Sequence, residues 1–82
     1  MSDASEILRA AALEVGWEPP EGDEDAIARW CLAQLRVIAG GQDRDHAANA
    51  VRSALDAARA GNAEYATAGL RIARDATLPH AH

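Results

Sequence analysis

Apolar residues recur at intervals of three or four positions along most of the chain, and glycine or proline interrupts this pattern at three places. Such spacing is typical of helices that bury one face, because three to four residues make one helical turn. It predicts helices over about residues 3–15, 24–39, 44–60 and 62–76. No stretch alternates strictly between apolar and polar residues, so an all-α fold without strands is expected.

The ends of the predicted helices carry residues that commonly start and stop helices. Gly16, Gly40–Gly41 and Gly61 follow apolar segments, as expected for the left-handed residue that often ends a helix. The predicted starts carry side chains that can accept a backbone N–H bond, namely Ser2 or Asp3, Asp23, Asp43 and Asn62. Because the links are short, we expect consecutive helices to pack as antiparallel neighbours in a small four-helix bundle.

The last two predicted helices present mainly alanine and glycine to each other. Gly69 lies in the middle of the stripe that is predicted to face inward, and Tyr65 and Ile72 lie on the same stripe. Glycine inside a helix costs about 1 kcal/mol relative to alanine, and it is best tolerated where a second backbone comes close. We therefore expect residues 44–60 and 62–76 to form a tight hairpin packed through alanine and glycine.

The predicted helix over residues 24–39 is apolar around most of its circumference. Its larger apolar residues are Ile27, Trp30, Cys31, Leu32, Leu35, Val37 and Ile38. Only Arg29 and Arg36, seven positions apart, mark a clearly solvated strip. A helix of this kind lies at the centre of its bundle or in an interface, and in so small a domain we expect both.

The size and composition fit one small domain. The chain has 82 residues, about a quarter of them alanine, with no phenylalanine and with arginine as the only basic residue besides histidine. That usage is typical of high-GC bacteria and their phages. We expect one helical domain over residues 1–78 and a flexible tail over 79–82. Because so small a domain has a thin core, self-association as a homodimer is expected to help its stability.

The charge and the single cysteine narrow the possible partners and location. A net charge of −5 opposes non-specific binding to nucleic acid or anionic membranes. No apolar run is long enough to span a bilayer, and the N-terminus does not resemble a signal peptide. Cys31 is the only cysteine, so no internal disulfide can form. A cytoplasmic protein is expected.

Few residues could carry chemistry. The sequence contains none of the common motifs for nucleotide binding, hydrolysis or zinc binding. His80 and His82 fall in the predicted tail, and His46 lies in the first turn of a predicted helix. Ligands without supporting side chains bind metals poorly, so no metal and no cofactor are expected. We therefore predict that the protein is not an enzyme.

An alternative function comes from the two middle helices, which could form a helix-turn-helix around the Gly-Gly turn. The second of them exposes Asn49, Arg52 and Arg59, residue types that contact bases and phosphates. Asp45 and Asp56 share that surface and would repel the DNA backbone. A small DNA-binding regulator is therefore the alternative to a protein-binding function.

The favoured function is protein–protein contact through an apolar surface. Its candidate residues are Leu13, Trp17, Arg29, Trp30, Arg36 and Val37. Leu13 lies opposite the apolar stripe of its helix, and tryptophan and arginine are frequent at interface hot spots. A second interpretation stays open, in which the link over residues 16–22 folds back so that the two tryptophans complete the core. The sequence thus predicts a non-catalytic interaction module, such as an adaptor, an inhibitor or an accessory subunit.

Overall fold

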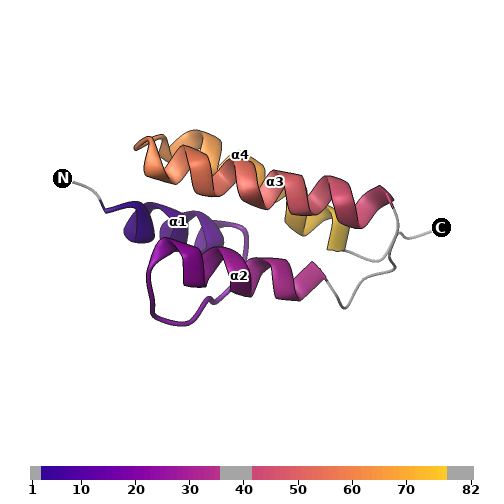
Figure 1. The fold of residues 1–82 in the computed structure, drawn as a ribbon, viewed down its shortest axis with the longest axis horizontal. Helices are drawn as coiled ribbons and strands as arrows, with labels where there is room; N and C mark the ends of the chain where they lie inside the picture. The colour runs from indigo at the N-terminus through magenta and orange to yellow at the C-terminus, as the bar shows by residue number, and fades with distance from the viewer. Residues whose placement is uncertain (1–2, 36–41, 78–82) are drawn as a thin grey trace.

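The computed structural model describes residues 3–35 and 42–77, and all regular structure in these two ranges is helical (Figure 1). The four helices are α1 (Ala4–Glu14), α2 (Glu24–Gln34), α3 (Gln42–Arg59) and α4 (Ala63–Thr77). They pack together around one apolar core. The predicted all-α class and the four predicted helices are confirmed for this part of the chain.

Part of the predicted second helix lies outside the described residues, and the third helix begins earlier than predicted. Several predicted features lie outside the described residues: the extension of α2 to residue 39 with Arg36 and Val37, the Gly40–Gly41 stop, and the tail over 79–82. α3 begins at Gln42, so Asp43 lies within its first turn and does not precede the helix as predicted. An acidic residue is favourable both as a cap and in the first turn, so its presence alone does not fix the first helical residue.

The remaining helix ends follow their local sequence. Each of three capping side chains accepts a backbone N–H bond: Asp3 Oδ1 from Ser5 at 3.2 Å, Asp23 Oδ1 from Ala26 at 2.8 Å, and Asn62 Oδ1 from Tyr65 at 3.1 Å. Gly16 and Gly61 adopt φ values of 90° and 80° directly after α1 and α3. These are left-handed conformations that glycine adopts at little cost, so both helices stop where the sequence predicts.

The core is built from bulky residues in one half of the molecule and from small ones in the other. α1 and α2 bury Ile7, Leu8, Ala11, Ala12, Ile27, Ala28 and Cys31, with Val15 and Leu35 following them. α3 and α4 bury Ala47, Ala50, Val51, Ala54, Ala58, Ala66, Leu70 and Ala73. Six of these eight residues are alanine, so the second half contributes little side-chain volume to the core.

α2 is not the central helix over the described residues. α1 and α3 each pack against all three other helices, whereas α2 packs against α1 and α3 and barely touches α4. The reason lies in the link between α1 and α2. Trp17 of this link packs edge-on against Trp30 of α2, with ring centroids 6.1 Å apart and planes at 79°. The link therefore helps cover the wide apolar face of α2 that was expected to need surrounding helices.

α3 and α4 lie side by side and approach each other closely at Gly69 (Figure 1). A Cβ atom at this position would lie 2.8 Å from the carbonyl oxygen of Ala50 and 3.1 Å from Cβ of Ala54. Real side chains do not tolerate the first of these distances without a shift of the backbone. Glycine is therefore required for this approach, as its place in the apolar stripe suggests.

The prediction that Tyr65 and Ile72 face inward is wrong. Their exposed fractions are 71% and 46%, while Ala66, Leu70 and Ala73 are fully buried. On a helical projection the inward direction is rotated from the predicted one by roughly 60°, towards Leu70. The close contact at Gly69 leaves no volume between α3 and α4 for a tyrosine or an isoleucine, so these side chains lie on the surface.

Candidate functional site

The predicted binding residues differ in exposure within the described part of the chain. Leu13 is 55% exposed, and Arg29 is exposed as well. Trp17 and Trp30 contact each other, are half-buried and pack against the core. The tryptophan pair therefore fits the interpretation in which the link folds back. Arg36 and Val37 lie outside the described residues.

Arginine side chains hold the link in this position. Nη1 and Nη2 of Arg9 donate to the carbonyl oxygens of Pro19 and Pro20 at 3.3 and 2.9 Å. Nη1 of Arg74 donates to the carbonyl oxygen of Val15 at 3.3 Å, which places a cation at the C-terminal end of α1. Hydrophobic periodicity cannot reveal these bonds, because they join residues that are distant in sequence to carbonyl groups of the link.

Arg59, one of the candidate DNA contacts, is engaged within the protein. Its Nη2 lies 2.6 Å from Oδ1 of Asp25, and its Nε lies 3.8 Å from Oε1 of Glu24. Arg59 is in the last turn of α3 and the two acids are in the first turn of α2. Each charge also interacts favourably with the dipole of its own helix, because the acids lie at the N-terminus of α2 and the arginine lies at the C-terminus of α3.

One hollow of about 370 Å³ lies along α3 and α4, and we call this surface the α3–α4 face. α3 contributes His46, Asn49, Ala50, Ser53 and Ala57, and α4 contributes Tyr65, Ala68, Gly69 and Ile72. None of these is an Asp, Glu or Arg, although about a quarter of the chain is charged. Two of the three large apolar residues that are exposed in the described ranges, Tyr65 and Ile72, lie on this face.

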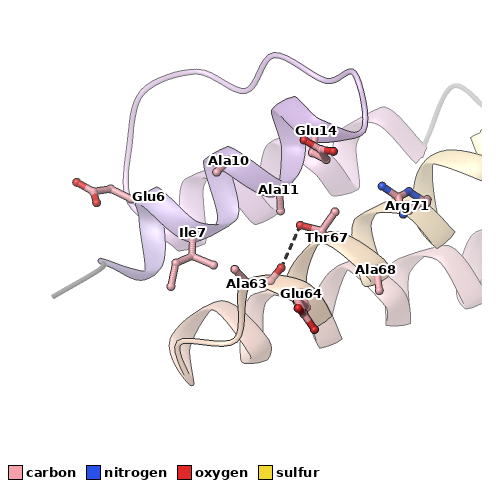
Figure 2. A pocket seen from close by; sticks show the side chains of 10 residues that line it. All are labelled: Glu6, Ile7, Ala10, Ala11, Glu14, Ala63, Glu64, Thr67, Ala68 and Arg71. Carbon is pink, nitrogen blue, oxygen red and sulfur yellow. Dashed lines mark hydrogen bonds between the residues drawn. The ribbon is translucent and has the colours of Figure 1, made fainter.

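A second hollow of about 600 Å³ lies between α1 and α4, and we call it the α1–α4 groove (Figure 2). α1 lines it with Glu6, Ile7, Ala10, Ala11 and Glu14, and α4 lines it with Ala63, Glu64, Thr67, Ala68 and Arg71. Ile7 and Ala11 form its buried floor. The hydroxyl of Thr67 donates to the carbonyl oxygen of Ala63 at 3.0 Å, so this side chain is satisfied within α4 (Figure 2).

Sequence reasoning missed both hollows, but one signal was present. The lining positions of α1 and of α4 follow the same spacing of i, i+1, i+4, i+5 and i+8, and most of them are alanine or glutamate. Small residues flanked by acids on two helices can indicate a shallow groove. Which two helices lie next to each other is decided by the tertiary packing, so the signal could not be used in advance.

Few of the described side chains are placed to react or to bind a metal ion. Burial raises the pKa of the Cys31 thiol to about 12, so the thiol is neutral and shielded. Within residues 3–35 and 42–77, no group of three or more His, Cys, Asp or Glu side chains is placed to hold a metal ion. In the same ranges, no helix has both the length and the apolarity that crossing a membrane requires.

Comparison of the chain with protein-family models, with curated proteins and with solved structures found no match. The two hollows are therefore the features of the described residues that bear on function.

Proposed function

We propose that the protein is a small non-catalytic interaction module that self-associates through the α3–α4 face. The observation that carries this proposal is the exposure of Tyr65 and Ile72, at 71% and 46%, beside a hollow on a surface without charged residues. Exposed large apolar residues around a hollow are typical of protein-binding surfaces. Adaptor, inhibitor and accessory subunit are all roles that such a module can fill.

A second copy of the chain is the occupant that fits the charges. Each molecule carries a net charge of −5, so two copies repel each other over most of their surface. A two-fold dimer places the same patch of both molecules in contact, and like charges in that patch would oppose it. The α3–α4 face avoids this problem because it contains no Asp, Glu or Arg.

A stable dimer would have to extend beyond the residues that line the hollow, along the outer sides of α3 and α4. A typical interface buries about 800 Å² on each partner, which is about 15% of the 5226 Å² of accessible surface of the chain. α4 has 15 residues and is therefore about 22 Å long. Two such helices side by side present a face about 20 Å wide. In the dimer, Tyr65 and Ile72 of each copy are expected to enter the hollow of the other.

A matched pair of variants tests this proposal. Ile72→Glu places a charge on the α3–α4 face, whereas Leu13→Glu makes a similar exchange at an exposed leucine of α1 outside that face. Sedimentation velocity at several protein concentrations should show a dimer for the wild type and for Leu13→Glu, and a monomer for Ile72→Glu. Circular dichroism should show that both variants remain helical.

Two results would overturn the proposal. A wild type that is monomeric at high micromolar concentration would exclude self-association through any face. A dimer that is broken by Leu13→Glu and kept by Ile72→Glu would instead favour the surface predicted around Leu13, Trp17 and Arg29.

The finer packing of the bundle is part of the same proposal. We propose that consecutive helices run antiparallel. Two observations support this. Arg59 at the end of α3 pairs with Glu24 and Asp25 at the start of α2. Only residues 60–62 separate α3 from α4. The helix-turn-helix alternative stays a prediction that no observation favours, since Arg59 is paired internally and Asn49 lines the α3–α4 face. Fluorescence anisotropy on duplex DNA at low salt is expected to show no binding.

A further inference from the structure

We infer that the α1–α4 groove is a docking site for a cationic amphipathic helix of a partner protein. This inference goes beyond self-association because it concerns a different kind of partner and a surface that shares only Ala68 with the α3–α4 face. It follows from the shape of the groove, from the short side chains that form its walls and from its unpaired carboxylates.

The shape of the groove fits a short helical segment. Its first and last lining positions are eight residues apart on both α1 and α4, which corresponds to about 12 Å or two helical turns. The floor consists of the buried side chains of Ile7 and Ala11. Ala10, Ala63 and Ala68 form exposed parts of the walls. These short side chains leave space for the bulky apolar residues of a partner helix, as in other helix-in-groove complexes.

The charges along the groove select a basic partner. Glu6 and Glu14 line the groove from α1, and Glu64 lines it from α4. None of the three makes an ion pair or a side-chain hydrogen bond within the part of the chain that the structure describes. By contrast, Glu24 and Asp25 on α2 are both engaged by Arg59. The carboxylates of the groove are therefore free to pair with cations of a partner.

The arrangement of these charges also predicts the spacing of the basic residues on the partner helix. Figure 2 shows Glu6 at one end of the groove and Glu14 with Arg71 at the other. Glu6 and Glu14 are about 12 Å apart along the axis of α1, too far to share one ion. Arginine or lysine residues seven positions apart on a partner helix are separated by nearly the same distance. Arg71 is the single cation among the lining residues, and it weakens the attraction at its own end.

A set of designed peptides tests this inference. The probe is a blocked helical peptide of about 15 residues, with leucines on one face and two arginines seven positions apart beside them. A matched peptide carries glutamate in place of both arginines. Fluorescence anisotropy on the full chain should show binding of the arginine peptide, weakening as salt is added, and no binding of the glutamate peptide.

Variants of the protein locate the binding site. The double variant Glu6→Gln/Glu14→Gln should weaken binding of the arginine peptide by about three- to tenfold, as expected for the loss of two exposed ion pairs. The matched control Glu18→Gln/Glu21→Gln removes two exposed carboxylates from the link and should change the affinity by less than about twofold. Arg71→Gln should strengthen binding, because it removes the cation from the groove.

The inference is tested separately from self-association. The peptide should bind the Ile72→Glu variant at least as well as the wild type, because Ile72 does not line the groove. Loss of binding in Ile72→Glu would place the peptide on the α3–α4 face and overturn the inference. Equal weakening by both double variants, or equal binding of both peptides, would also overturn it.

Discussion

The two halves of this small bundle achieve close packing in opposite ways. α1 and α2 fill their side of the core with Leu8, Ile27 and Leu35, and Trp17 and Trp30 pack against it. α3 and α4 pack mainly through alanine and bring their backbones together at Gly69. The first half buries several large apolar side chains, whereas the second half buries mainly alanine together with Val51 and Leu70.

This difference explains why α4 carries exposed large apolar residues. Tyr65 and Ile72 belong to the alanine-rich half, and they lie on the surface because Gly69 lets α3 approach too closely. The sequence pointed instead to the half with more bulky residues as the binding side. The close contact between α3 and α4 therefore leaves Tyr65 and Ile72 on the outer surface of this hairpin.

The largest expected effect is the removal of volume from the α1–α2 half. Ile27 is fully buried, and Ile27→Ala should lower the free energy of unfolding by about 3 kcal/mol, because it loses apolar burial and leaves a cavity. Leu13→Ala removes similar volume from an exposed site and should cost less than about 1 kcal/mol. Urea unfolding followed by circular dichroism measures both. Equal losses would show that the buried volume of this half is not what stabilises it.

Adding side-chain volume should destabilise the α3–α4 half. Gly69→Leu adds a side chain where even a Cβ atom would lie 2.8 Å from a backbone oxygen, and we expect a loss of about 2 kcal/mol. Ala33→Leu enlarges an exposed residue of α2 that lines neither hollow, and it serves as the control. The same urea experiment should show little change for the control. A neutral Gly69→Leu would contradict the close approach of the two helices.

The burial of Cys31 predicts a pH dependence for the α1–α2 half. The pKa of this thiol is raised from 9.0 to about 12 in the folded protein, so the folded state retains the proton and the unfolded state loses it above pH 9. The contribution of the buried thiol to the free energy of unfolding is therefore fully present below pH 9, and it is lost as the pH rises towards 12. At pH 10 the loss should reach about 1.4 kcal/mol.

The variant Cys31→Ala isolates this effect. It should lack this part of the decrease in stability between pH 9 and 11, as measured by urea unfolding at each pH. An identical decrease in the variant and the wild type would show that the thiol is hydrated in the folded state.

The smallest expected effects concern the helix caps, which are local and should not distinguish the halves. Asp23 caps α2 and Asn62 caps α4, each through one backbone N–H bond. Asp23→Ala and Asn62→Ala should each cost about 1 kcal/mol. Glu21→Ala, at an exposed acid without such a bond, is the control and should be nearly neutral. Clearly unequal losses for the two caps would show that packing modulates them.

Much of the secondary structure could be predicted because its signals are local. Asp3, Asp23 and Asn62 cap helices as expected, and Gly16 and Gly61 end them with positive φ values. The need for glycine at position 69 also followed from its place in an apolar stripe. In each case the residue type and its near neighbours contain the physical reason. The first turn of α3 was missed by two residues because acids are favourable on both sides of a helix start.

The candidate surfaces could not be predicted in the same way. A stripe that contains Ala66, Gly69, Leu70, Ile72 and Ala73 is compatible with more than one inward direction. The approach distance between α3 and α4 selects the direction that buries Leu70 and exposes Ile72. The acidic groove depends in turn on α1 lying beside α4, a contact between segments far apart in the sequence.

Local sequence was therefore sufficient for the helices, their caps and the glycine that permits the close contact, because each depends on backbone energetics within a few residues. Tertiary packing decided which apolar side chains were buried, how the tryptophan link covered α2, and where hollows formed. Those outcomes depend on distances between helices, which are set by the volumes of side chains from several elements at once.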